Sequence, residues 1–113
     1  MAGKGPHLSP AEVSALAEVK RRIAALYPVH AFILFGSKSR GDDRPDSDVD
    51  LLVVTRTTLS DAERRRVSHE VFDVNMAHDT LFSTVVIDRG TYESSLWQRL
   101  PLLQDVAAEG VAV

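Results

Sequence analysis

Hydrophobic residues recur at helical spacing near the start of the chain. Six of them form one stripe: Val13, Leu16, Ala17, Ile23, Ala24 and Tyr27. Ser9 offers an N-cap, Pro10 the first helical position and Glu12 the reciprocal acid of a capping box, while Pro28 can end the helix. This pattern predicts a helix over 10–27 that packs its apolar stripe on a sheet.

Continuous apolar runs, in contrast, predict buried strands. The runs AFILF and LLVV and the segment LFSTVVI favour strands over about 30–35, 48–55 and 81–87. A short turn or helix over 37–41 is expected between the first two strands. The order of elements is therefore helix, strand, strand, helix, strand, followed by a C-terminal region with apolar residues at helical spacing.

The second helix is expected between the second and third strands. Ser60 and Glu63 form another capping box, and three valines, Val67, Val71 and Val74, then recur on one face to about residue 77. The run Glu63 to Arg66 is expected to lie largely in water. From about residue 91 a further helix is predicted, broken at Pro101 and with Gly110 as its C-cap.

Two aspartates stand at the head of the second expected strand. Because side chains alternate between the faces of a strand, Asp48 and Asp50 project from one face and Val49 and Leu51 from the other. Side chains two residues apart are about 6.5 to 7 Å apart along a strand, a span from which two carboxylates can hold one Mg²⁺ or flank a pair of ions. A divalent cation relieves their repulsion and takes further ligands from water and phosphate. The acid pair therefore predicts a metal site that works with a nucleotide.

The loop before the acid pair offers groups that bind phosphate. Gly36 follows the first strand directly, where the absence of a side chain lets backbone N–H groups approach a ligand closely. Ser37 adds a hydroxyl, and Lys38, Arg40 and Arg44 add positive charge. Because phosphoryl transfer depends on positioning and charge neutralisation, the loop and the acid pair together predict a nucleotide-phosphate site.

Other interpretations of the acidic stretch fit the residues less well. A solvated acidic turn does not explain acids that head a strand whose next four residues are apolar. An EF-hand loop starting at Asp46 needs glycine at its sixth position and glutamate at its twelfth, where the chain has Leu51 and Thr57. Neither a Walker A loop nor a G-x-G-x-x-G sequence occurs.

The stretch GSKSRGDDRPDSDVDLLVV resembles the signature of minimal nucleotidyltransferases of the DNA polymerase beta superfamily. The resemblance implies an α/β (α+β) fold with a mixed sheet and helices packed mainly on one face. It implies that Gly36 and Ser37 contact the nucleotide phosphates, with help from Arg40. It also implies that Asp48 and Asp50 hold Mg²⁺ and are the catalytic acids.

The same resemblance implies a reaction and a partner. A hydroxyl would attack the α-phosphate of ATP or another NTP, and pyrophosphate would leave. Small members of this kind are often paired with a HEPN-domain ribonuclease toxin, so the chain is expected to be an antitoxin that adenylylates its partner. Because 113 residues leave no room for an acceptor domain, the acceptor is expected on a partner protein or across a homo- or hetero-oligomer interface. A binding module that neutralises its partner by contact alone, and transfer to an antibiotic or other small hydroxyl compound, stay open.

One position departs from the superfamily pattern. Many members place a third aspartate on a neighbouring strand, and the matching residue here is the neutral Ser83. The ion that activates the nucleophile would then lose a negative ligand, although the nucleotide-associated ion keeps both acids. Asp73, Asp79 and Asp88 are possible substitutes, but Asp79 precedes the third strand and Asp88 lies on its opposite face.

Composition limits the protein to one domain of modest size. With 44% hydrophobic and 26% charged residues, a flexible tail over 1–8 and a single nucleotidyltransferase-like domain over 9–113 are expected. The apolar runs are far shorter than the roughly 18 residues of a membrane helix, and no signal peptide is recognised, so a cytoplasmic location is expected. The absence of cysteine excludes disulfides, and the net charge of -3 argues against a broad nucleic-acid surface.

Overall fold

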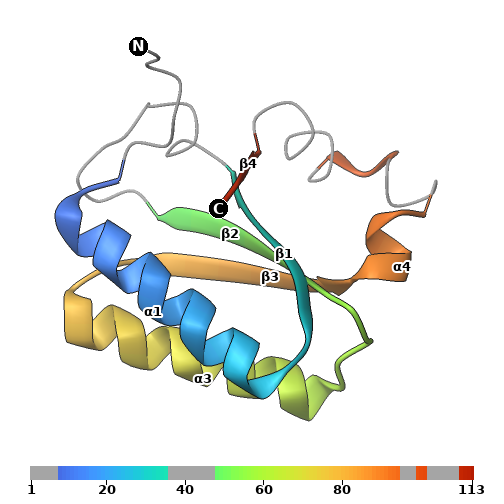
Figure 1. Ribbon diagram of the computed structural model, residues 1–113, viewed down its shortest axis with the longest axis horizontal. Coiled ribbons are helices and arrows are strands. Elements are labelled where there is room, and N and C mark those ends of the chain that lie inside the picture. The colour runs from blue at the N-terminus through green and yellow to red at the C-terminus, as the bar shows by residue number, and fades with distance from the viewer. Residues whose placement is uncertain (1–7, 36–47, 95–98, 102–109) are drawn as a thin grey trace.

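The computed structural model describes residues 8–35, 48–94, 99–101 and 110–113. In chain order, the elements are α1 (Pro10–Leu26), β1 (Val29–Phe35), β2 (Val49–Thr55), α3 (Asp61–His78), β3 (Phe82–Asp88), α4 (Arg89–Tyr92) and β4 (Val111–Ala112) (Figure 1). Three expectations fall outside the described residues: the tail up to residue 7, the turn over 37–41, and parts of the C-terminal helix expected from about residue 91.

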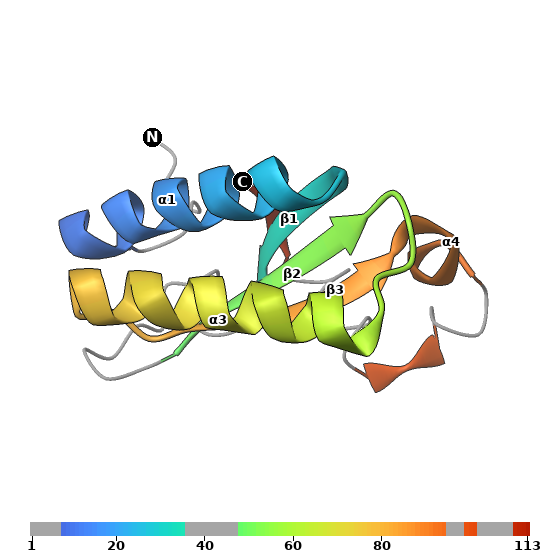
Figure 2. The same ribbon diagram turned by 90° about the horizontal axis from the view of Figure 1, so that it is seen from below.

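The four strands form one mixed sheet in the order β3-β2-β1-β4. Strand β1 pairs antiparallel with β2 and with β4, whereas β2 and β3 run parallel. A parallel pair needs a crossover connection, and α3 supplies it. Helices α1 and α3 lie side by side on one face of the sheet (Figures 1 and 2). This arrangement confirms the predicted α+β class with a mixed sheet and helices mainly on one face.

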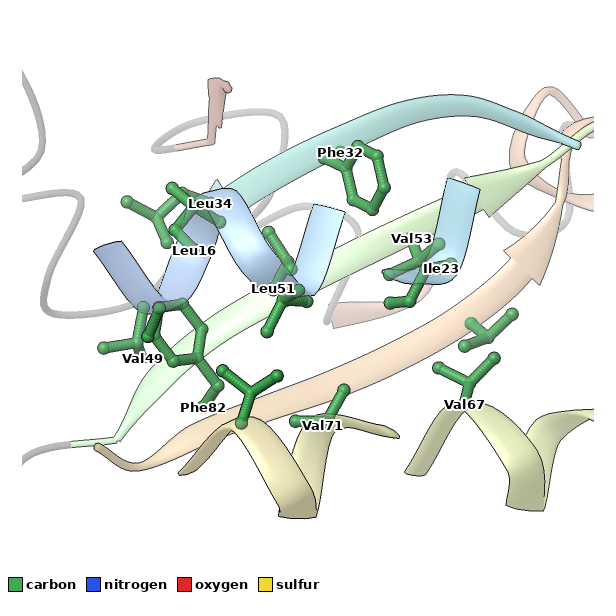
Figure 3. Close-up of a cluster of buried hydrophobic side chains, with 14 of the residues drawn as sticks. Leu16, Ile23, Phe32, Leu34, Val49, Leu51, Val53, Val67, Val71 and Phe82 are labelled. Atoms are coloured by element: carbon green, nitrogen blue, oxygen red, sulfur yellow. The ribbon is translucent and has the colours of Figure 1, made fainter. Parts of the chain in front are cut away.

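The main core lies between β2 and the two long helices. Val49, Leu51 and Val53 are fully buried and pack with residues of α1 and α3, including Val67 and Val71 (Figure 3). The alternate residues of β2 pack in a second buried cluster with neighbours from β1 and β3: Phe35, Leu52, Val54 and Ile87. Because β2 is buried on both faces, its sequence is a continuous apolar run, and this made the strand predictable.

Helix α1 begins as expected but presents a different face to the core. Ser9 Oγ accepts from the backbone N–H of Glu12 at 3.1 Å, and the Ser9 N–H donates to the Glu12 carboxylate at 2.9 Å. The predicted stripe is wrong in part, because Val13, Ala17 and Ala24 are exposed. The buried residues are Glu12, Ala15, Leu16, Val19 and Ile23. Turning the helix this way buries the larger Val19 beside Leu16 and Ile23, which removes more apolar area from water than two alanines would.

The C-terminal segment contains a strand that the sequence pattern did not reveal. The sequence predicts a helix ending at Gly110, whereas the two residues after Gly110 form β4 on the outer edge of β1, with Leu34 paired to Val111. The N–H of Val113 also donates to the carbonyl of Phe32 at 3.0 Å. A two-residue strand is too short to show any period. Within the described part of the chain, no helix has the length and apolarity to cross a membrane.

An ionic network joins the outer sides of α1 and α3. The Glu18 carboxylate accepts from Arg22 at 2.9 Å and contacts His78 Nε2 at 3.1 Å, and Arg22 also donates to Glu70 at 3.0 Å. The hydrogen bond with His78, followed by that from Arg22, lowers the pKa of Glu18 below its ordinary value. The ionised carboxylate therefore ties together two helices that lie far apart in the sequence.

This network predicts that the folded state loses stability in acid. A carboxyl whose pKa is lower in the folded state adds stability above its ordinary pKa of 4.5, and that stability is lost as the pH falls through the lowered value. Urea unfolding measured between pH 6 and pH 3 should therefore show a decline that is smaller in Glu18→Gln. The exposed Glu93, paired with Arg89 within one helical turn, supplies the control, and an equal effect of Glu93→Gln would contradict the prediction.

Candidate active site

The two aspartates lie at the head of the central strand β2. Asp48 immediately precedes β2 and is exposed, Val49 is buried in the core, and Asp50 is half-buried. In the sheet, Asp50 is paired with Phe35 of β1 on one side and with Ser83 of β3 on the other. Because Val49 and Leu51 face the helices, Asp50 projects from the opposite face of the sheet. The predicted alternation is therefore present over Val49, Asp50 and Leu51.

The surroundings of Asp50 disfavour its negative charge. Burial raises the pKa of Asp50, and the negative charge of Asp48 raises it further. The two carboxylates therefore repel each other, and one of them is partly withdrawn from water. This donor set fits a hard divalent cation, which takes carboxylate oxygens as ligands and cancels such repulsion. Asp48 and Asp50 are the residues that would hold it.

The described residues offer that cation no third acid. Within residues 8–35, 48–94, 99–101 and 110–113, no three His, Cys, Asp or Glu side chains are grouped to hold a metal ion. Ser83 occupies the position beside Asp50 on β3, and its side chain is exposed. Residues paired in register project from the same face of a sheet, so Ser83 and Asp50 are neighbours on the face away from the helices.

The three alternative aspartates have other surroundings. Asp73 is exposed on α3. Asp79 is the C-cap of α3 in the left-handed conformation, with φ of 56°. Asp88 lies at the far end of β3, where its carboxylate accepts from the Thr91 N–H at 3.0 Å and the Thr91 hydroxyl at 2.6 Å. These bonds from Thr91 lower the pKa of Asp88. The structure brings none of the three to the acid pair.

The predicted phosphate-binding residues follow β1 in the chain. Strand β1 ends at Phe35, the residue paired with Asp50, so the chain leaves the sheet beside the acid pair. Gly36, Ser37 and Arg40 come next and lie outside the described residues. Their assignment as phosphate contacts stays a prediction.

A shallow groove lies beside Ser83 at the edge of the sheet. It runs between α3 and β3, has a volume of about 280 Å³, and is lined in part by Phe72 and Asn75 of α3 and by Phe82, Ser83 and Thr84 of β3. Phe72 is 60% exposed there. Ser83, which is paired with Asp50 in the sheet, is among the residues that line the groove, whereas Asp48 and Asp50 do not line it.

Two polar residues of α3 that sequence reasoning did not select hold the outer edge of β3. The guanidinium of Arg64 donates to the carbonyl of Val86. The side chain of Asn75 bonds both backbone groups of Phe82, at 2.9 and 3.0 Å. The expectation that Arg64 lies largely in water is thus wrong, because its donors satisfy a backbone carbonyl of an edge strand. The sequence offered one signal for Asn75: this polar residue follows the buried Val71 by four positions, a spacing that puts both on the same face of the helix.

Comparison with known proteins agrees with this architecture. The family described as "Nucleotidyltransferase domain" matches residues 16–82, which include both Gly36-Ser37 and the acid pair. No curated protein matches the chain. A crystal structure of a toxin–antitoxin complex with AMP-PNP contains a similar chain, with a TM-score of 0.61 and 22% identity over 88% of this chain and 69% of that one.

A second similar structure is a mutant form of the toxin–antitoxin MntA–HpeT. Its TM-score is 0.59 at 22% identity, covering 89% of this chain and 70% of that one. At this level of identity the likeness concerns the fold. The family match extends over more than half of the chain. On that match, the chain belongs to the nucleotidyltransferase domain family.

Proposed function

We propose that this protein is a Mg²⁺-dependent nucleotidyltransferase that moves AMP from ATP to a hydroxyl of a partner protein. The observation that carries the proposal is the acid pair: two carboxylates two residues apart at the head of β2, one of them with a pKa raised by burial and by the other's charge. Two ionised carboxylates held close together raise the free energy of the folded protein unless a cation binds between them. Acids with pKa values perturbed in this way are concentrated at functional sites.

Each residue of the site has a distinct task in this proposal. Asp48 and Asp50 would hold Mg²⁺, and the ion would supply positive charge to neutralise the triphosphate. Gly36 and Ser37 would offer N–H and hydroxyl donors to the phosphates, and Arg40 a positive charge. Strand β2 keeps the acids on a rigid support, because the residues that follow them are buried between the helices and the second cluster.

The reaction is a substitution at the α-phosphorus of ATP. The acceptor oxygen forms a bond to that phosphorus, the bond to the oxygen that bridges to the β-phosphate breaks, and pyrophosphate leaves. The acceptor's hydroxyl proton passes to solvent, since Ser83 beside Asp50 offers no carboxylate to receive it. The chain contributes position and charge neutralisation, and these account for most of the rate enhancement in phosphoryl transfer.

The proposed acceptor is a toxin protein encoded with this chain. The structural neighbours are toxin–antitoxin complexes, one of them with AMP-PNP, and this supports both a nucleotide and a toxin partner. The more specific assignment to a HEPN ribonuclease toxin rests on the resemblance of the Gly-Ser and Asp-x-Asp stretch. We also propose a cytoplasmic location and a single domain over 9–113.

The test is transfer of label from ATP to the co-encoded partner. The purified chain is incubated with Mg²⁺, labelled ATP and the partner, and intact masses are recorded, with the Asp48→Ala/Asp50→Ala double variant alongside. The expected result is an AMP increment on the partner that the double variant does not produce. An increment of the same size with the double variant would refute the assignment of the acids.

A second function is favoured by one observation, the serine beside Asp50. With no third acid among the described residues, the fold could serve as a binding module that neutralises its partner by contact. That function predicts a stable unlabelled complex and equal neutralisation by wild type and the double variant. Partner activity measured in the same mixtures therefore separates the two functions.

Replacing Ser83 by aspartate tests whether the missing third carboxylate limits the rate of AMP transfer. A carboxylate in register with Asp50 would add a negative ligand, so we expect the rate of AMP transfer at limiting Mg²⁺ to rise by about tenfold. Steady-state transfer as a function of Mg²⁺ concentration measures this. Ser83→Asn is the control, since it enlarges the side chain without adding charge. Equal rates in both variants would show that charge at this position does not limit the reaction.

A further inference from the structure

Asn75 forms an unusually dense set of hydrogen bonds near the end of α3. Its Oδ1 accepts from the backbone N–H of Phe82 at 2.9 Å and from the Thr80 hydroxyl at 3.0 Å, and its Nδ2 donates to the Phe82 carbonyl at 3.0 Å. Its backbone carbonyl accepts from the N–H groups of Asp79 and Thr80. One residue thereby organises the whole connection between α3 and β3.

The carboxamide of Asn75 takes the place of a neighbouring strand. Strand β3 is at the edge of the sheet, so alternate residues direct their backbone groups away from β2. At Phe82, the first residue of β3, Asn75 satisfies both the N–H and the carbonyl. The start of β3 is therefore fixed from both sides, by β2 within the sheet and by α3 outside it.

The start of β3 is also hydrogen-bonded to the backbone of the residue that lies between the two acids. The carbonyl of Leu81, just before Phe82, accepts from the N–H of Val49 at 2.9 Å. Val49 is the residue between Asp48 and Asp50, and it is paired in register with Phe82. A hydrogen-bonded route thus runs from Asn75 through the backbone at residues 81 and 82 to the backbone of the acid pair.

We infer that Asn75 is a positioning residue for the metal site: it fixes the start of β3 and through it the relative orientation of the Asp48 and Asp50 carboxylates. The inference rests on the proposed function, since it concerns the cation that the acids would hold. Groups that orient metal ligands from outside the site commonly change metal affinity by about 10–100-fold when they are removed. Asn75 acts from α3 without touching the cation itself.

Arg64 provides a matched contrast on the same helix. It also bonds the outer edge of β3, but at the carbonyl of Val86, which is paired with Val53 near the opposite end of the strand from Ser83. Removing the Arg64 side chain releases one hydrogen bond between α3 and β3, whereas removing the Asn75 side chain releases two, both at Phe82. Only the loss of Asn75 releases the end of β3 that adjoins the acids.

The experiment measures Mn²⁺, a paramagnetic substitute for Mg²⁺, by electron paramagnetic resonance titration of the full chain with AMP-PNP present. Wild type is compared with Asn75→Ala, Asn75→Asp, Arg64→Met and the Asp48→Ala/Asp50→Ala double variant, each checked for folding by circular dichroism. We expect Asn75→Ala to weaken Mn²⁺ binding by about tenfold or more, and Arg64→Met to change it by less than about twofold.

Asn75→Asp keeps the acceptor oxygen and loses the donor to the Phe82 carbonyl, so it is the variant to use if Asn75→Ala does not fold. Added negative charge attracts a cation, so weaker Mn²⁺ binding in this variant would have to come from altered geometry and would support the inference. Binding by the folded Asn75 variants that equals wild type or Arg64→Met would overturn it. Failure of wild type to bind Mn²⁺, or binding unchanged in the double variant, would instead overturn the proposed function, and the inference with it.

Discussion

Replacing Asp50 with asparagine is expected to abolish nucleotide transfer and, at the same time, to make the metal-free protein more stable. Because burial and the charge of Asp48 raise the pKa of Asp50 in the folded state, that state favours the protonated form. Stability contributed by a raised pKa is present below the ordinary value of 3.8 and is lost as the pH rises through the raised value. At neutral pH the ionised carboxylate therefore opposes folding, and asparagine removes this penalty.

The expected sizes of the two effects differ greatly. Loss of a metal-holding carboxylate removes several kcal/mol of charge stabilisation, so AMP transfer should fall by about 100-fold or more. The gain in stability should be about 0.5–1 kcal/mol, because water screens much of the repulsion at a half-buried site. Transfer rates and urea unfolding in the presence of EDTA measure the two quantities on the same preparation.

Asp79→Asn is the matched control for Asp50→Asn. It removes the same charge from an exposed left-handed position, and asparagine adopts that conformation readily. It should leave both transfer and stability close to wild type. Lower stability of metal-free Asp50→Asn than of wild type would contradict the electrostatic account, whatever the effect on transfer.

Truncating Leu51 to alanine is expected to cost the fold about 3–4 kcal/mol. Leu51 follows the acid pair directly, is fully buried in the central strand, and belongs to the cluster between β2 and the helices (Figure 3). The cost combines the lost transfer free energy of the side chain with the cavity that rigid neighbours leave behind. Since domains of this size are stable by about 5–15 kcal/mol, this cost is a large part of the total free energy of unfolding.

Urea unfolding gives the measurement for Leu51→Ala, as a lower midpoint with an unchanged slope. Val13→Ala is the control, because Val13 is 54% exposed on α1 and should change the free energy of unfolding by less than about 0.5 kcal/mol. A cost below about 1 kcal/mol at Leu51 would mean that the helix-facing side of β2 is not closely packed.

Features that depend on local signals could be predicted from the sequence. Strand β2 was predictable because burial on both faces demands an uninterrupted apolar run, and the start of α3 because Ser60 and Glu63 complete a capping box, with the Glu63 N–H donating to Ser60 Oγ at 3.1 Å. The projection of Asp50 away from the core residues Val49 and Leu51 followed from strand alternation alone. These are properties of a few adjacent residues.

Features that depend on contacts between distant segments could not be predicted in the same way. The burial of Val19 rather than Val13 depends on how α1 sits on the sheet, since an alanine-rich helix offers more than one apolar stripe. The contact of Arg64 with Val86 depends on where α3 crosses the edge of β3. An arginine run in isolation looks like a solvated helix face, and only the sheet edge beside it gives Arg64 a partner.

The pairing of β1 has a consequence for how the sheet is completed during synthesis. One edge of β1 is covered by β2, which follows soon after in the chain, but the other is covered by β4, the last strand described. On the ribosome, β1 would therefore keep an open edge until Val111 emerges. Such an edge can pair with other nascent chains. A chain that terminates before β4 would still have β2, the strand that carries the acids, between β1 and β3. It would nevertheless be prone to aggregate through the open edge of β1.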